Sequence, residues 1–209
     1  VPFQFIGIRE GVTAPRWMVV GPFGGPGIKE IGGNLKGKEK KKAVQFYKDQ
    51  TYPIDGGHVD PEATFSGPMI EGYWKKNDAL HWKEAEIEGL DTRVKMGHVA
   101  QLYFGTTAIY SPEEAEVELV LQGHNQTYLT WWINGEEFSP GPKEYRSDSD
   151  RMNARRLYPI SITLQKGWNQ IVSRGFCVGY NPYRVGVVVK APSETLWKLK
   201  FSPLPTSEF

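Results

Sequence analysis

Hydrophobic and polar positions alternate along much of the chain, in short runs that end at turn residues. Val117, Leu119 and Leu121 are separated by single residues, a spacing typical of an antiparallel strand with one solvated face. β-Branched and aromatic residues dominate the other runs, and this composition also favours strands. The pattern predicts nine strands, at residues 16–20, 81–88, 98–110, 115–122, 126–133, 157–164, 169–176, 184–190 and 195–201.

Turn and loop signals divide these runs. Asn134-Gly135 lies between Ile133 and Glu136, and Asn-Gly supplies the two positive φ values that a type I′ hairpin turn requires. Residues 36–50 have helix-forming content with a narrow apolar side, which predicts one short surface helix. Two segments, about 51–80 and about 139–156, have no sustained period and predict long loops.

The predicted elements indicate an all-β protein. Nine strands and no repeat of 20–50 residues favour an antiparallel β-sandwich over a propeller or a solenoid. A chain of 209 residues suits a single domain over 1–209.

Composition and charge remove several classes of function. There are 25 Lys and Arg residues against 24 Asp and Glu, a formal net charge of +1, so no overall field favours a nucleic acid. No apolar run approaches the roughly 20 residues of a membrane span. A lone cysteine, Cys177, excludes an internal disulfide framework and a cysteine-rich zinc site. Because the chain starts at Val1 with no signal peptide, we expect a processed mature protein or an excised domain.

Four segments carry a resemblance to a known family. They are residues 17–23 (WMVVGPF), 108–122 (AIYSPEEAEVELVLQ), 132–136 (WINGE) and 164–172 (LQKGWNQIV). Together they resemble galactose-binding-like jelly-roll domains, the carbohydrate-binding-module-like β-sandwiches of secreted bacterial glycan-degrading proteins. The resemblance implies a jelly-roll sandwich that binds carbohydrate in an extracellular, periplasmic or cell-surface location. The two long loops lie outside these motifs, so the resemblance carries no ligand specificity for them.

Sugar binding requires a flat apolar face and a few polar groups. Period two along 126–133 puts Leu129 and Trp131 on a core face, and Tyr128 and Trp132 on the other face. That other face is either a ligand platform or covered by the long loops. Further candidates lie in the loop with Tyr73-Trp74, the 139–156 loop, and the turn 177–184 (CVGYNPYR), and each also fits ordinary loop packing. The predicted ligand-binding residues are Tyr73, Trp74, Trp132, Tyr145, Tyr180, Asn181, Tyr183 and Arg184.

One acidic segment could serve catalysis. Asp55, His58, Asp60 and Glu62 lie within eight residues (DGGHVDPE), and a glycoside hydrolase needs two carboxylates across a cleft. The same composition is also typical of turns. These four residues are therefore the catalytic candidates if the protein is an enzyme.

The metal signals are few. Asp148 and Asp150 alternate in SDSDR, a pattern that fits a structural Ca²⁺ and equally a solvated acidic turn. Calcium also accompanies many domains of the resembled family. The four histidines have no zinc-ligand spacing, and no motif requires another cofactor.

Three functions follow for the predicted sandwich. The first is a non-catalytic carbohydrate-binding module or lectin-like domain that takes polysaccharide or oligosaccharide. The second is a glycan-active enzyme, a hydrolase or a lyase, that works through the two long loops. The third is a structural accessory domain that packs on a catalytic domain in the same or a partner chain. The sequence leaves the choice between binding and catalysis open.

Overall fold

A computed structural model of the protein describes residues 11–23, 38, 45, 49, 51–65, 79–87, 92–97, 102–124, 127–139, 155–177 and 183–207. These residues are mostly antiparallel β-structure, as the alternating pattern predicts. The short helix α3 (Ser193–Leu196) lies between the last two strands. The strands are β1 (Gly11–Thr13), β2 (Arg16–Val20), β3 (Lys83–Glu86), β4 (Val94–Gly97), β5 (Leu102–Ser111), β6 (Ala115–His124), β7 (Thr127–Ile133), β8 (Glu136–Phe138), β9 (Arg155–Leu164), β10 (Gly167–Cys177), β11 (Tyr183–Lys190) and β12 (Lys200–Ser202).

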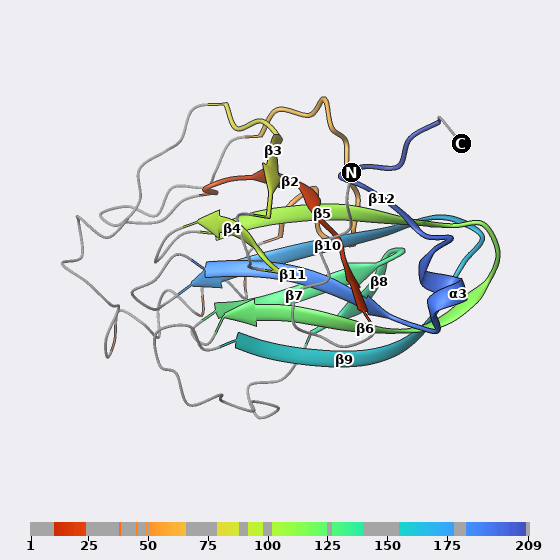
Figure 1. Ribbon diagram of the computed structural model, residues 1–209. Coiled ribbons are helices and arrows are strands. Elements are labelled where there is room, and N and C mark those ends of the chain that lie inside the picture. Colours follow the sequence, from red (N-terminus) through yellow and green to blue (C-terminus); the bar gives the residue numbers. More distant parts are fainter. Residues whose placement is uncertain are drawn as a thin grey trace.

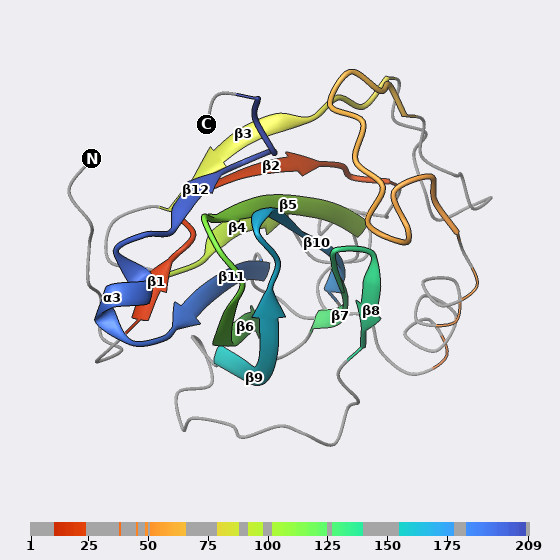
Figure 2. The same cartoon turned by 90° about the vertical axis from the view of Figure 1, so that its right-hand side faces the viewer.

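The strands form two antiparallel sheets that lie one over the other (Figures 1 and 2). The first sheet, called sheet A here, has the order β1-β11-β6-β9, and β4 also pairs with β11. The second, sheet B, has the order β3-β2-β5-β10-β7-β8. Strand β12 pairs with β5 beyond the part of β5 that β2 occupies. The two facing sheets confirm the prediction of an all-β, sandwich-like protein.

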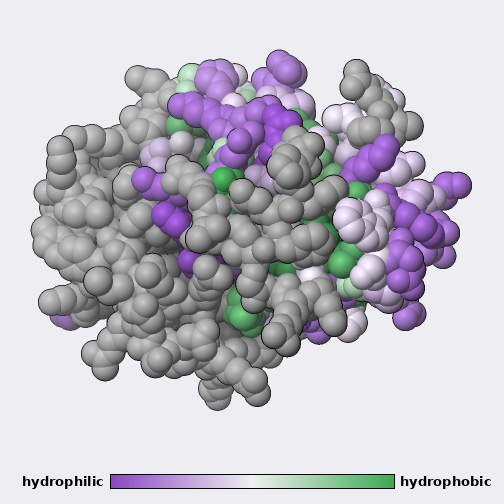
Figure 3. Space-filling view, in the orientation of Figure 1, coloured by the Kyte–Doolittle hydropathy of each residue, from purple (hydrophilic) through white to green (hydrophobic). Residues whose placement is uncertain are grey.

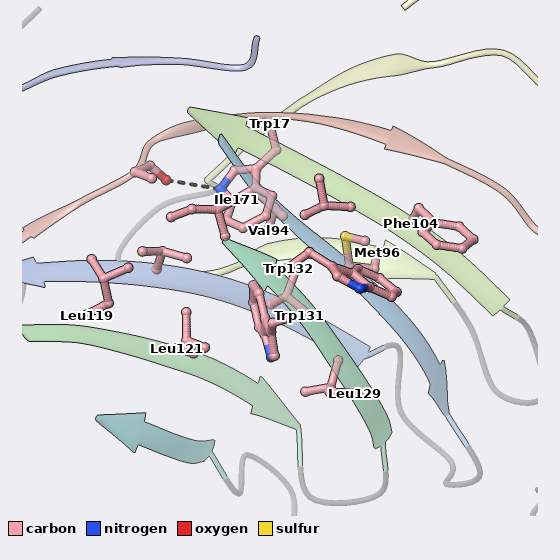
Figure 4. Close-up of a cluster of buried hydrophobic side chains, with 14 of the residues drawn as sticks. Trp17, Val94, Met96, Phe104, Leu119, Leu121, Leu129, Trp131, Trp132 and Ile171 are labelled. Atoms are coloured by element: carbon pink, nitrogen blue, oxygen red, sulfur yellow. Dashed lines mark hydrogen bonds between the residues drawn. The ribbon is translucent and has the colours of Figure 1, made fainter. Parts of the chain in front are cut away.

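Alternate side chains of sheet B point toward sheet A and form the core. Trp131, Ser173 and Gly105 are register partners across β7, β10 and β5, so they face the same side of the sheet. Trp17 and Trp131 are fully buried there, with ring centroids 6.5 Å apart in an edge-to-face arrangement. The indole Nε1 of Trp17 donates to the carbonyl of Ala14 at 3.1 Å, and Figure 4 shows Trp17 beside Ile171 of β10 and Trp131 beside Leu121 of β6. This core holds the two sheets together.

The other face of sheet B, called the outer face here, carries a second apolar cluster. Phe104 of β5 registers with Arg174 of β10, one position along from the core-facing residues. Phe104 packs edge-to-face on Phe23 at 5.4 Å and on Tyr52 at 5.5 Å between centroids. Tyr52 is the second residue of the described loop 51–65, so this cluster fastens the loop to the sheet.

Several predicted elements are confirmed. Asn134 and Gly135 have φ values of 51° and 85°, as a type I′ turn requires, and they join β7 to β8. Of the helix predicted over 36–50, the structure describes only Lys38, Gln45 and Asp49, which are helical, and the other positions of that prediction lie outside the described residues. Glu113 and Glu114 are exposed in the connection between β5 and β6.

Other predictions need correction. The strand predicted over 195–201 is wrong in its first half, where α3 begins after Pro192 and only β12 remains a strand. The carbonyl of Pro192 accepts hydrogen bonds from the amides of Thr195 and Leu196, and these bonds favour a helical turn. Strands β1, β4 and β8 were not predicted, because runs of three or four residues are too short to establish a period.

The longest stretch of helix in the described part of the chain is too short to cross a membrane.

Candidate functional site

An ion pair joins the 51–65 loop to the outer face of sheet B. Arg174 Nη1 lies 3.2 Å from Asp55 Oδ1 and 3.0 Å from Asp55 Oδ2. The side chains are 9% and 19% exposed. The guanidinium carbon also lies 5.2 Å from the centroid of the Tyr52 ring, within the range of a cation–π contact. The charged guanidinium of Arg174, in the middle of a sheet face, thus has two partners, the Asp55 carboxylate and the Tyr52 ring.

Polar side chains continue from this pair toward the sheet edge. Thr130 of β7 is the register partner of Arg174 and shares its face. The Ser139 hydroxyl lies 2.9 Å from Glu137 Oε1 and 3.3 Å from Thr130 Oγ1, within hydrogen-bond distance of both oxygens. We call Asp55, Arg174, Thr130, Ser139 and Glu137 the polar row. At its inner end Arg174 is buried and Asp55 is half-buried, and at its outer end Ser139 and Glu137 are exposed.

Burial dominates the electrostatics at the inner end of the row. Desolvation raises the pKa of the Asp55 carboxyl above its ordinary value, and the nearby Glu137 carboxylate raises it further. Arg174 and the backbone N–H of Tyr52, which donates to Asp55 Oδ2 at 2.8 Å, act in the opposite direction. Both Asp55 oxygens therefore already accept hydrogen bonds from the protein.

Two glycines allow the loop to approach the hairpin. Gly56 and Gly57 have φ values of 85° and 82°, a region that favours glycine. A Cβ on Gly57 would lie 3.2 Å from the Cβ of Trp132 and 3.5 Å from the Cα of Gly135. The loop thus lies directly against the turn between β7 and β8. In Figure 2 the loop lies on the outer side of sheet B.

The structure does not assemble the four acidic-segment residues into one centre. Asp55 is held by Arg174, whereas His58, Asp60 and Glu62 are exposed. Asp60 Oδ1 accepts the backbone N–H of Glu62 at 3.0 Å, which is turn chemistry. Within the described ranges, no group of three or more His, Cys, Asp or Glu residues could hold a metal ion.

The burial of Trp132 decides between the two interpretations of its face, a ligand platform or a face covered by the long loops. Its side chain is 4% exposed, because the loop at Gly57 lies over it. A ligand platform at Trp132 is therefore excluded in this conformation, and coverage by the loop, the other alternative, is what the structure has. Tyr128, on the same face, is half-buried.

The remaining predicted site residues are distributed as follows. Arg184 is half-buried on β11, where it registers with Lys95 of β4, and Tyr183 precedes it as the register partner of Gly97. Neither belongs to the polar row. The predicted residues outside the described part of the chain are Tyr73, Trp74, Tyr145, Tyr180 and Asn181, and the calcium candidates Asp148 and Asp150.

The sequence pattern did not predict that Arg174, Glu137 and Ser139 belong to one polar row. A signal for Arg174 was present, since a single charge inside an apolar strand run needs a buried partner. Glu137 lies just past the turn between β7 and β8 and is exposed. Its proximity to Asp55 depends on where the loop folds back, which no local pattern encodes.

Comparison with protein-family models, curated proteins and solved structures finds no match to this chain.

Proposed function

We propose that the protein is a non-catalytic carbohydrate-binding domain of secreted glycan degradation, on a sandwich of the galactose-binding-like jelly-roll type. The observation that carries the proposal is the polar row on the outer face of sheet B. Its exposed end combines the Ser139 hydroxyl with the Glu137 carboxylate, which are 2.9 Å apart. Hydroxyls and carboxylates supply the donors and acceptors that sugar hydroxyls require.

Binding without catalysis fits the state of Asp55. The carboxylate accepts bonds from Arg174 and from the Tyr52 amide, so it orders the loop instead of facing a reacting bond. The row is also preorganised, because strand register and hydrogen bonds hold its members before any ligand arrives. Preorganisation lowers the entropy cost of binding.

Affinity electrophoresis tests this proposal. The protein is run through gels that contain xylan, mixed-linkage β-glucan, alginate or hyaluronan, with calcium and with a chelator. We expect retardation in at least one gel, and a loss of about tenfold in affinity for the double variant Ser139→Ala/Glu137→Gln, equivalent to about one charge-assisted hydrogen bond. Glu116→Gln, an exposed change on β6 of the opposite sheet, is the control. Unretarded migration in all four gels contradicts the proposal.

A second candidate, glycoside hydrolysis, is favoured by one observation. Asp55 and Glu137 are two carboxyl groups on one face, and the pKa of Asp55 is raised. A general acid with a raised pKa beside a second carboxylate is the arrangement that glycosidases use. Chromatography of the same samples separates the two functions. New oligosaccharides that disappear in both Asp55→Asn and Glu137→Gln would establish hydrolysis.

A further inference from the structure

Trp197 is the most exposed large hydrophobic side chain among the described residues, at 65%. The other exposed one is Leu157, at 45%. Leu157 registers with Gln122 near the end of β6, whereas Trp197 precedes Lys198, which binds Glu113 before the start of β6. The two side chains therefore lie at opposite ends of β6 and form no common apolar patch. Figure 3 shows mostly hydrophilic side chains at the end of the molecule where α3 lies in Figure 1.

The backbone around Trp197 is well anchored. Leu196 and Leu199, on either side of it, are buried in the core. The amide of Trp197 donates to the carbonyl of Ser193 at 3.0 Å, and the amide of Leu199 donates to the carbonyl of Leu196 at 3.2 Å. Two inward leucines on a hydrogen-bonded turn direct the intervening tryptophan outward. The main chain that carries the indole is therefore ordered before any ligand binds.

Charged groups lie next to Trp197. Lys198 Nζ is 2.6 Å from Glu113 Oε1, and the two side chains are 52% and 62% exposed. This pair holds the pKa of Glu113 below its ordinary value and that of Lys198 above it, so both groups stay charged at neutral pH. A carboxylate and an ammonium together offer acceptors and donors beside the indole.

The end of the molecule that carries Trp197 is separate from the polar row. Lys200, three residues after Trp197, registers with Tyr110 on β5. Arg174 of the polar row registers with Phe104 on the same strand. Six positions along a strand correspond to about 20 Å. The two places are therefore separate contacts, and a single sugar unit does not touch both.

From these observations we propose that Trp197 is a stacking platform for a pyranose ring, with Lys198 and Glu113 bonding its hydroxyls, as a second sugar contact of this domain. The inference rests on the carbohydrate-binding function proposed above. One flat aromatic face with polar groups beside it matches a sugar ring. A protein partner needs about 800 Å² with an apolar centre, and the described surface around Trp197 is charged.

The test compares Trp197→Ala with Leu157→Ala in the same four polysaccharide gels. Leu157→Ala is the matched control, because it removes the other exposed hydrophobic side chain. We expect Trp197→Ala to lose about tenfold in affinity with an unchanged melting temperature, and Leu157→Ala to bind as the wild type does. Trp197→Tyr keeps an aromatic ring and should retain most of the affinity, which separates stacking from an effect on folding.

The outcomes separate this inference from the proposed function. If the wild type is retarded and Trp197→Ala binds equally well, the platform is overturned and the function stands. If Trp197→Ala changes the elution volume in gel filtration, Trp197 is a protein contact and the platform is again overturned. If no gel retards the wild type, the proposed function and the platform both fail. If Trp197→Ala loses affinity and Ser139→Ala/Glu137→Gln does not, the platform stands and the polar row is not the site.

Discussion

Asn134, in the turn between β7 and β8, and Asn169, near the start of β10, bond to each other through their side-chain amides. Asn134 Nδ2 donates to Asn169 Oδ1 at 2.9 Å, and Asn134 Oδ1 accepts the backbone N–H of Gln170 at the same distance. Asn169 is fully buried, and its Nδ2 lies within hydrogen-bond distance of the carbonyls of Ile109, Gln165 and Gly167. One side chain thus links β5, the turn before β10, and the β7–β8 hairpin.

Replacing Asn169 should destabilise the fold strongly. Asn169→Ala leaves several buried backbone groups without a partner and opens a cavity, so we expect a loss of about 2–4 kcal/mol in the free energy of unfolding. Urea denaturation followed by tryptophan fluorescence measures it. Asn134→Gly, which keeps the positive φ and removes only the side-chain bonds, should cost about 1 kcal/mol. Equal losses in the two variants would contradict the central role of Asn169.

The Asp55–Arg174 pair should show strong energetic coupling. Arg174→Met leaves the Asp55 carboxylate without its main partner, and we expect a cost of about 3 kcal/mol. The double variant Asp55→Ala/Arg174→Met should cost less than the two single changes added together, by about 1–3 kcal/mol. A double-mutant cycle from chemical denaturation gives this coupling energy. Additive effects would mean that the pair does not hold the loop.

The contribution of Asp55 to stability should depend on pH. Its pKa is raised in the folded protein relative to the ordinary value of 3.8, so the folded state binds the proton at a higher pH than the unfolded chain does. The contribution is therefore fully present below about pH 3.8 and is lost as the pH rises through the raised pKa. The difference in unfolding free energy between wild type and Asp55→Asn should fall across this range. A difference that grows with pH would show that the attraction of Arg174 outweighs burial.

A side chain at position 57 should destabilise the protein. Gly57→Ala adds a Cβ 3.2 Å from the Cβ of Trp132 at a φ of 82°, so the variant suffers both backbone strain and a tight contact. We expect a loss of about 1–2 kcal/mol in the free energy of unfolding. Gly167→Ala is the matched control, because its φ is 103° and nothing lies within 4 Å of the added Cβ. If the two variants lose the same stability, the approach of the loop to the hairpin is not tight.

Local sequence patterns correctly predict most of the strands in the two sheets. The alternation in 115–122, the β-branched and aromatic runs, and Asn134-Gly135 each predict an element that the structure contains. These signals are local, since side-chain period and turn stereochemistry depend only on neighbouring residues. The strand predicted over 195–201 was wrong in its first half, because Leu196 and Leu199 can be buried from a helical turn as well as from a strand. Packing alone decides between these two conformations.

Tertiary structure alone decided the candidate site. Asp55 and Arg174 are 119 positions apart, and neither strand period nor turn composition indicates that the 51–65 loop returns to β10. The same return covers Trp132, whose face the sequence left open as either a ligand platform or a face covered by the long loops. The sequence by itself determined which residues share a side of each strand. Which of those sides is buried, paired or open depends on contacts between distant segments, and these exist only in the folded chain.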